Sequence, residues 1–338
     1  MSWTYNQYKK EHKDEHPKAF WKEHEKEPWF MERYNPLTVY QIKLEQKQLA
    51  QKKAQQFFKS MPLTHLDLTK HDDVEMGDKE EGPQIYKFDT NSRTLYLKQV
   101  PVFVSRSQLK DAVNAVCGGL EQVIFSEPLK SKDFERFAWL EFVTEDLCNA
   151  AITDLETLVI RAPEAYNVDD FKLCPVKNNQ TLRAPKVTPD LPVDHVQRDY
   201  DLCKKLIQDV YNKEKGIEFP FGQLESSVES LNTRLDTLLV YLRQVHGYCF
   251  YSGVKCDNER ALAAKCSPQY LRQPPSVERE LFDTSPLYGS AKQFETNYTQ
   301  AAEKIIADGA GEALVDPLED EFLKSMKEEY CFNKTKEV

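Results

Sequence analysis

The sequence predicts an α+β protein that is predominantly α-helical, with helical N-terminal and C-terminal regions packed around a βαββαβ module. Three observations lead to this fold class. Apolar side chains recur at helical spacing in residues 1–66 and 190–338. Residues 91–180 change to short runs that are typical of strands alternating with helices. The chain has 338 residues, 40% hydrophobic and 11% aromatic, which is enough for more than one core.

The N-terminal helical domain, residues 1–66, is expected to contain one long helix. Asn35 followed by Pro36 is typical of an N-cap and a first helical position, where the missing N–H of proline costs nothing. We expect this helix to span residues 36–60, with one apolar side. That side comprises Val39, Ile42, Leu49 and Phe57.

Large aromatic side chains precede this helix, on short helices that Pro17 and Pro28 interrupt. They are Trp3, Tyr5, Tyr8, Phe20, Trp21, Trp29, Phe30 and Tyr34. So much apolar surface is costly to expose, and we expect these side chains to pack on one another or on a later domain. We therefore interpret the N-terminal region as structural.

Residues 67–90 form a predicted acidic linker. Asp and Glu side chains surround Gly77 and the Gly82-Pro83 pair in this stretch, and such a composition favours an exposed connection. The linker separates the N-terminal domain from the next folding unit.

The α/β module, residues 91–180, has a defined order of elements. Ser105 and Gln108 offer a capping box for its first helix, which Gly118 and Gly119 end. We expect strands at 95–100, 122–125, 137–143 and 171–176, and helices at 105–117 and 144–154. This order is βαββαβ, the ferredoxin-like plan of RNA-recognition modules, so the module is predicted to be RRM-like.

The C-terminal helical domain, residues 190–338, is dominated by one apolar stripe. Asp194 is expected to cap a first helix that stops near Gly216. Residues 224–245 are then predicted to form a single helix, because apolar side chains recur there every three or four residues. The stripe comprises Leu224, Val228, Leu231, Leu235, Leu238, Leu242 and Val245. We expect neighbouring helices to bury it, although a partner coil would fit the same spacing. Further helices are expected near 291–307 and 318–329.

Aromatic side chains on the strands of the module are the candidate nucleic-acid-binding residues. Strand alternation places Phe137, Trp139 and Glu141 on one sheet face with Tyr96 and Lys98 of the first strand. The three rings would stack with bases, each stack contributing about 1–3 kcal/mol. The binding residues are thus predicted to be Tyr96, Lys98, Phe137 and Trp139.

The alternative is that a helix of the protein covers this sheet face. Three aromatic rings suit a docking helix equally well, and Glu141 would repel phosphates. Arg136 also replaces the glycine of the usual RNA-recognition fingerprint.

Catalysis, metal binding and cofactor binding have no positive signal, and we predict no enzyme. The spacing of His246, Cys249, Cys256 and Cys266 matches no compact zinc template. His195 and Cys203 have no oxyanion-type glycine loop nearby, and no glycines fall in a phosphate-binding order. A hydrolase or transferase would instead require a deep pocket that holds His195 or His246 beside an acidic residue.

Composition limits the partners and the compartment. A net charge of −10 works against indiscriminate nucleic-acid binding, so RNA contacts must come from local patches. The eight cysteines are scattered without close pairs, which predicts a reducing compartment, nucleus or cytosol. Apolar runs fall well short of the roughly 20 residues that span a bilayer, and the first residues do not form a signal peptide.

Several stretches share their pattern with one known family. They are YKKEH at 8–12, FWKEH at 20–24, EPWFMERYNP at 27–36, TLYLKQVP at 94–101, SEP at 126–128, AWLEF at 138–142, and residues 199–208 and 235–266. These stretches resemble the N-terminal domain, a degenerate RNA-recognition module and the helical domain of the Serrate family. Its members are the arsenite-resistance proteins of nuclear RNA metabolism.

The resemblance implies a non-enzymatic nuclear scaffold. Such a scaffold links capped nascent RNA and the cap-binding complex to RNA processing, RNA-mediated gene silencing by small RNAs, or exosome-mediated RNA decay. The implied partners are the cap-binding complex and RNA-processing or exosome-adaptor proteins. We expect a monomer without membrane contact, and the alternative function is direct binding of single-stranded RNA by the sheet face.

A zinc finger is expected to follow in this family. It would begin near Cys331, but the sequence stops at Val338 before a second Cys and two His appear. We therefore expect either a truncated chain or a member without the finger.

Overall fold

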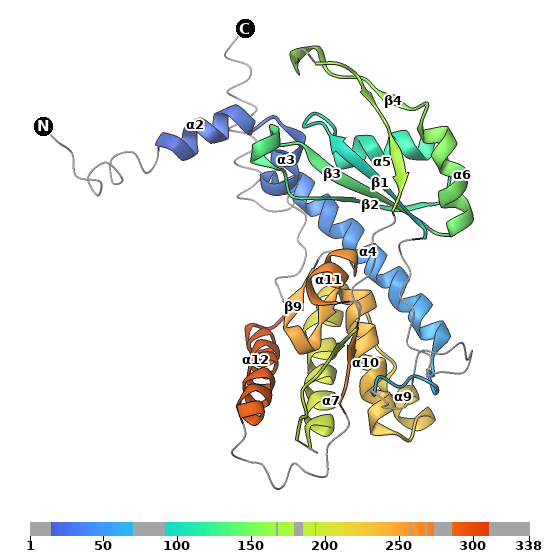
Figure 1. The fold of residues 1–338 in the computed structure, drawn as a ribbon, viewed down its shortest axis with the longest axis vertical. Helices are drawn as coiled ribbons and strands as arrows, with labels where there is room; N and C mark the ends of the chain where they lie inside the picture. The colour runs from blue at the N-terminus through green and yellow to red at the C-terminus, as the bar shows by residue number, and fades with distance from the viewer. Residues whose placement is uncertain are drawn as a thin grey trace, which may run out of the picture. The chain divides into compact units, whose positions relative to one another are not determined.

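The computed structural model describes residues 15–69, 92–166, 168–178, 185–192, 194–256, 259–267, 269–273 and 286–310 (Figure 1). It confirms the predicted class, because the fold is α+β and mainly helical. The chain groups into two compact units. The described part of the first unit covers residues 15–43 and 92–178, and that of the second covers 44–69 and 185–310. The four-part division made from the sequence stays a prediction.

A four-stranded antiparallel sheet forms the centre of the first unit. Its strands are β1 (Thr94–Val100), β2 (Leu120–Phe125), β3 (Arg136–Phe142) and β6 (Pro175–Lys177), in the order β2-β3-β1-β6. Helices α5 (Arg106–Val116) and α6 (Glu145–Leu155) lie on one side of it (Figure 1). The major elements therefore follow the predicted β, α, β, β, α, β order.

One face of the sheet and the two helices enclose a single apolar core. Leu95, Leu97, Ala138 and Leu140 of the sheet belong to the same buried cluster as Leu109 of α5 and Leu155 of α6. The predicted capping box of α5 is confirmed, because Ser105 Oγ accepts from the Gln108 N–H at 3.0 Å and Gln108 Oε1 accepts from the Ser105 N–H at 3.1 Å.

The last predicted strand, 171–176, is wrong in its extent. Residues Phe171–Lys172 form β5, which pairs with β4 (Val159–Ile160) in a separate two-stranded ribbon. Only Pro175–Lys177 joins the main sheet, as an edge strand. Pro175 lacks an N–H, and a proline is tolerated at the first position of an edge strand.

Helices α2 (Glu15–His24) and α3 (Pro28–Tyr34) precede the sheet, and α3 packs against the loop that leads into β3. Trp29 stacks on Phe134 with ring centroids 5.0 Å apart. Glu32 Oε2 lies 2.6 Å from Arg136 Nη1, and Glu32 Oε1 accepts from the Arg106 N–H at 2.7 Å. The carboxylate of α3 thereby pairs with a buried guanidinium and caps the first turn of α5.

The aromatic side chains of this region pack on one another and on Phe134 of the sheet module, as expected, although they are only partly buried. Trp29 and Phe30 are buried, whereas Phe20, Trp21 and Tyr34 are 39%, 44% and 49% exposed. The predicted aromatics Trp3, Tyr5 and Tyr8 lie outside the described residues. A helix as short as α3 buries only its inner side, so the rings on its outer side and on α2 remain in contact with solvent.

The long helix α4 (Pro36–Ser60) has the predicted bounds, and it contributes residues to both units. Asn35 Oδ1 accepts from the N–H groups of Leu37 and Thr38, which confirms the predicted N-cap. Its buried residues differ from the predicted apolar side. They are Ala50, Ala54 and Phe57, whereas Val39, Ile42 and Leu49 are half-buried.

The second unit is built from helices around one large apolar core. A continuous helical segment comprises α7 (His195–Lys205), the π-helical η3 (Leu206–Tyr211) and α8 (Asn212–Lys215), and it stops at Gly216 as predicted. Asp194 precedes it but makes no side-chain cap, which corrects the expectation. The remaining helices include α11 (Glu259–Cys266) and α12 (Pro286–Asp308). The helix expected near 318–329 lies outside the described residues.

The apolar stripe is buried as predicted, but it does not form one helix. It divides into α9 (Phe221–Ser227) and α10 (Leu231–His246), with Val228 in an extended conformation. Ser230 supplies a new N-cap for α10, and the Arg234 guanidinium donates to the carbonyls of Val228 and Glu225. These bonds satisfy the backbone groups freed by the break, so the helix is interrupted without leaving Leu224 or Leu235 exposed.

Two buried carboxylates connect α10 and α7 to distant segments of the second unit. Asp236 accepts from the Leu68 N–H at 3.0 Å and pairs with Arg272 at 2.8 Å. Asp199 accepts from Tyr298 of α12 at 3.0 Å. Burial raises the pKa of Asp236 to about 7 and that of Asp199 to about 6.

Replacing Glu32 by Ala is expected to destabilise the first unit by about 3–5 kcal/mol, because Arg136 would remain buried without its carboxylate. Urea unfolding followed by tryptophan fluorescence measures this change. Glu127→Ala is the matched control, because it removes an ion pair between two exposed side chains. Glu127 is 80% exposed and its partner Arg33 is 56% exposed, so this substitution should cost at most about 1 kcal/mol. Equal effects of the two substitutions would contradict a dominant role for the buried pair.

Stability should also depend on pH through Asp199. The folded-state pKa lies near 6, above the ordinary value of 3.8, so the folded protein binds the extra proton and its stability falls as pH rises through this window. The free energy of unfolding of the wild type, relative to Asp199→Asn, should therefore drop by about 2.4 kcal/mol between pH 4 and pH 7. A difference that stays flat or rises over this interval, measured by urea titration at each pH, would refute this assignment.

Candidate nucleic-acid interface

The sheet face opposite α5 and α6 carries the predicted aromatic cluster. Tyr96 on β1 pairs directly with Trp139 on β3, and their ring centroids are 5.6 Å apart. The ring of Phe137, two residues along β3, lies 5.8 Å from that of Tyr96. Strand alternation explains the arrangement, because the intervening Ala138 and Leu140 point into the core. The structure thus brings together the three predicted aromatic residues.

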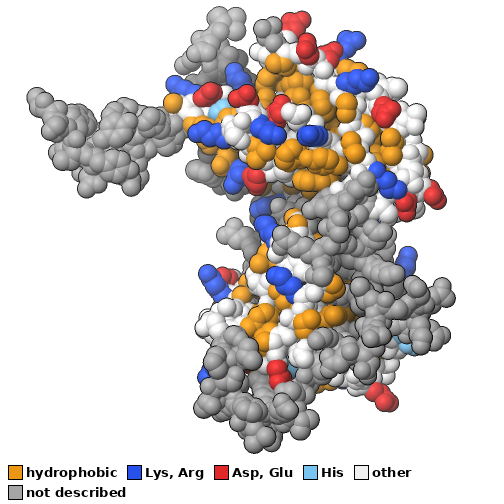
Figure 2. Space-filling view, viewed as in Figure 1, with side chains coloured by type: hydrophobic (Ala, Val, Ile, Leu, Met, Phe, Trp, Pro, Cys, Tyr) orange, Lys and Arg blue, Asp and Glu red, His pale blue; other side chains and the backbone are white. Residues whose placement is uncertain are grey.

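Solvent reaches this face in part. Tyr96, Phe137 and Trp139 are half-buried, and Val176, which pairs with Tyr96 from β6, is 56% exposed. In the view of Figure 2, hydrophobic side chains lie beside Lys and Arg side chains on the surface of the first unit. Partly exposed rings next to cations are typical of a stacking surface for single-stranded nucleic acid.

Lys98 lies at an irregularity that the sequence pattern does not show. The register between β1 and β3 shifts between Leu97 and Val100, and Gln99 has a φ of 64°. This is a β-bulge, which places one extra residue of β1 opposite β3. Lys98 lies within the bulge and is exposed, so its side chain is in contact with solvent.

A second cation, missed in the sequence, lies beside the cluster. The Lys132 ammonium is 5.5 Å from the centre of the Phe137 ring, within the range of a cation–π contact. Lys132 ends the short helix η1 (Lys130–Lys132) in the loop between β2 and β3. The lysines of that loop were the sequence feature that could have indicated a nearby cation. Only the folded loop shows that Lys132 reaches the Phe137 ring.

Glu141 does not present a bare carboxylate to this face. It is 5% exposed, accepts from Gln122 and lies 3.4 Å from Arg93 Nη2. Arg93 also pairs with Glu121 at 2.8 Å. The repulsion of phosphates expected from Glu141 is therefore reduced by burial and by a neighbouring guanidinium.

Arg136, which replaces the fingerprint glycine, has a structural role. Its guanidinium lies 3.9 Å from the centre of the Phe125 ring, donates to the Val104 carbonyl and pairs with Glu32. Burial lowers the pKa of Arg136, and the charge of Glu32 acts in the opposite direction. At 3% exposure this residue cannot contact a phosphate, so the departure from the fingerprint serves the docking of α3.

The His and Cys residues singled out in the sequence do not gather into the metal or catalytic site that was considered there. His246 Nε2 lies 2.8 Å from Asn212 Oδ1, and burial lowers its pKa to about 3. Cys249, Cys256 and Cys266 gather in a separate cluster. Burial raises the pKa of Cys203 and lowers that of His195. Within the described ranges, no three His, Cys, Asp or Glu side chains are arranged to hold a metal ion, and no helix is both long and apolar enough to cross a membrane.

Comparison with known families finds two models that match parts of the chain. The family model described as "SERRATE/Ars2, N-terminal domain" matches residues 1–89, which points to nuclear RNA processing as the class of protein. This match confirms the resemblance to the Serrate/Ars2 family over the N-terminal region. A second model, "Domain of unknown function (DUF4187)", matches residues 223–269, which include α10. Neither of these models is a zinc finger. No curated protein matches the chain.

Proposed function

We propose that this protein is a non-enzymatic scaffold of nuclear RNA metabolism, which links capped nascent RNA and the cap-binding complex to RNA processing, small-RNA or exosome-mediated decay machinery. The match of residues 1–89 to the Serrate/Ars2 N-terminal domain carries this proposal. Its partners would be the cap-binding complex and RNA-processing or exosome-adaptor proteins. The protein would act in the nucleus as a monomer.

The construction of the first unit supports a scaffold. The buried contact of Glu32 with Arg136 and the stacking of Trp29 on Phe134 fix α3 against the sheet module. Two different exposed surfaces result, one formed by Phe20, Trp21 and Tyr34 and the other by the sheet face. A rigid body with separate surfaces allows two partners to bind at once without competing.

A scaffold of this kind is expected to form a ternary complex. Immobilised full-length protein should bind purified cap-binding complex, and addition of an exosome adaptor should leave that complex in place. The assembly should retain capped RNA in clear preference to the same RNA without a cap, because the cap is recognised by the partner. Quantitative pull-down measures both. Mutual displacement of the two partners, or failure to bind either, would contradict the proposed scaffold role.

A second candidate function is direct binding of single-stranded RNA by Tyr96, Lys98, Phe137 and Trp139. The half-exposed, mutually adjacent rings favour it, together with the cation over Phe137 and the shielding of Glu141. A net charge of −10 means that stacking, rather than bulk attraction to phosphate, would supply most of the affinity.

Replacing Tyr96, Phe137 and Trp139 by Ala should weaken binding of a single-stranded oligoribonucleotide by about 1–3 kcal/mol for each base stack that is lost. Fluorescence anisotropy across a salt series measures this. Lys98→Ala should lower the slope of log affinity against log salt by about 0.7, whereas loss of the rings should leave that slope unchanged. Val168→Ala, at a 56% exposed position outside the four strands of the main sheet, is the control. Unchanged affinity in the triple variant would exclude the stacking surface, and wild-type binding too weak to measure would leave only the scaffold.

A further inference from the structure

Three cysteines between residues 249 and 266 form one buried cluster in the second unit. Cys249 ends β8 (Tyr248–Cys249), Cys256 follows β9 (Val254–Lys255), and Cys266 ends α11. Together with Leu262 they make up a small core of their own, and their exposed fractions are 4%, 8% and 2%. All three are free thiols. The cluster lies inside the stretch matched by the domain of unknown function.

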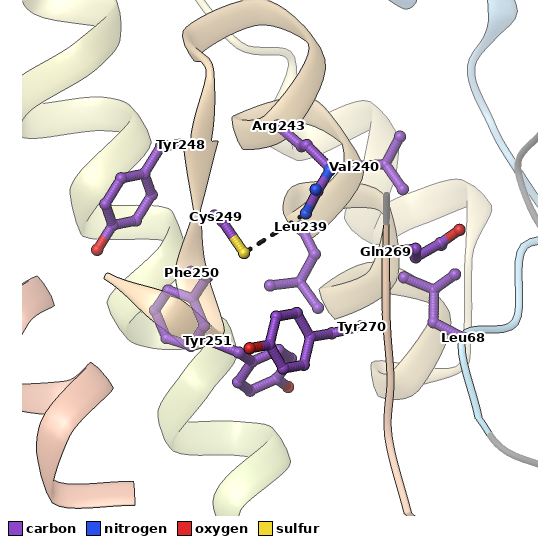
Figure 3. Close-up of a pocket in the computed structure, with 10 residues that line it drawn as sticks. All are labelled: Leu68, Leu239, Val240, Arg243, Tyr248, Cys249, Phe250, Tyr251, Gln269 and Tyr270. Carbon is purple, nitrogen blue, oxygen red and sulfur yellow. Dashed lines mark hydrogen bonds between the residues drawn. The ribbon is translucent and has the colours of Figure 1, made fainter. Parts of the chain in front are cut away.

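A guanidinium is directed at one of these thiols. Arg243 Nη1 on α10 donates to Cys249 Sγ at 3.4 Å, and Arg243 Nη2 donates to the Ser267 carbonyl (Figure 3). The second bond fixes the guanidinium beside the sulfur. A fixed positive charge next to a cysteine favours the thiolate, which is the nucleophilic form.

The two neighbouring thiols have unequal acidity. A hydrogen bond from the Cys266 thiol lowers the pKa of Cys249, and the charge of Arg243 acts in the same direction against the effect of burial. The pKa of Cys266 is raised, first because its thiol donates that hydrogen bond and then because of burial. Cys249 is therefore the reactive sulfur of the pair, and Cys266 lies within hydrogen-bonding reach of it.

A small cavity adjoins this pair. Its volume is about 30 Å³, and its lining includes Cys249, Arg243, Leu239, Tyr251 and Tyr270 (Figure 3). One water molecule requires about 10–15 Å³ of such volume, so the cavity holds a molecule the size of hydrogen peroxide.

We propose that Cys249 and Cys266 form a peroxide-sensitive dithiol, in which Cys249 is the site of oxidation and Cys266 is the resolving thiol. The geometry that carries this inference is the guanidinium on Cys249, the contact with Cys266 and the adjoining cavity. Cys256 belongs to the cluster but takes no part in the exchange.

The reaction needs only a hydroperoxide as oxidant. The Cys249 thiolate attacks one oxygen of hydrogen peroxide, the O–O bond breaks, and the departing hydroxide takes a proton to become water, which leaves Cys249 as a sulfenic acid. The sulfur of Cys266 then attacks the Cys249 sulfur. The S–S bond forms, the S–O bond breaks, and hydroxide leaves as water with the proton of Cys266. Two thiols and one peroxide thus give one disulfide and two waters. Two equivalents of a cellular thiol then reduce the disulfide back to two thiols and are themselves oxidised to a disulfide.

Treatment of the reduced full-length protein with hydrogen peroxide should produce a peptide that joins Cys249 to Cys266. Mass spectrometry without reduction detects it as a cross-linked species lighter by two hydrogens. The fully buried Cys148 and Cys203 should remain thiols under the same conditions. This measurement on the wild type requires no substitution and so does not depend on the folding of a variant.

Variants separate the roles of the residues. Cys266→Ser should stop the reaction at a sulfenic acid on Cys249, which dimedone traps, whereas Cys256→Ser should form the disulfide at the wild-type rate. Arg243→Gln should slow oxidation by about tenfold relative to Arg243→Lys, because only the latter keeps the charge that favours the thiolate. A disulfide between Cys249 and Cys256 instead, or oxidation of Cys249 no faster than that of Cys148, would overturn the proposal.

Discussion

A single buried ion pair, between Glu32 of α3 and Arg136 at the start of β3, organises the first unit. The pair holds a short amphipathic helix against a sheet that would otherwise lack a partner at that end. A buried guanidinium without its carboxylate is strongly unfavourable, so the two segments depend on each other. The Glu32 carboxylate also accepts a hydrogen bond from the Arg106 N–H, which connects α5 to the N-terminal region. The domain that matches the Serrate/Ars2 family and the sheet module are therefore joined by one carboxyl group.

The second unit uses the same kind of contact at other positions. Asp236 holds the backbone at Leu68 and the side chain of Arg272, and Asp199 holds Tyr298 of α12. Each carboxylate is surrounded by donors, but burial still raises its pKa, so the groups fix the arrangement of segments more than they add stability. Polar contacts of this kind specify which segments pack together around a core that is otherwise apolar and non-directional. Arg243 makes a further polar contact of this unit, with Cys249 and with the Ser267 carbonyl.

The features that bear on function lie where the local pattern departs from an ideal module. Arg136 replaces a fingerprint glycine, but it does not add its positive charge to the aromatic face. It points instead toward Val104 and Glu32, and the aromatic face keeps Tyr96, Phe137 and Trp139 together. The position of Lys132 over Phe137 adds positive charge at the edge of that face. A weak RNA-recognition fingerprint therefore coexists with three neighbouring, half-buried rings on one sheet face.

The sequence by itself determined the spacing of apolar side chains in each segment and the helix N-caps that depend on neighbouring residues. Asn35 before α4, Ser105 with Gln108 before α5, and the burial of the stripe from Leu224 to Val245 are local patterns of spacing and hydrogen bonding. Only the tertiary structure decided the break at Val228, the burial of Glu141 and Arg136, and the division of the last strand. Each of these depends on a partner that is distant in sequence or on a competition between backbone bonds, as with Arg234 and the Val228 carbonyl. The cysteine cluster is also a feature that only the tertiary structure decided. The spacing of the three cysteines does not indicate that the Arg243 guanidinium will lie against one of them.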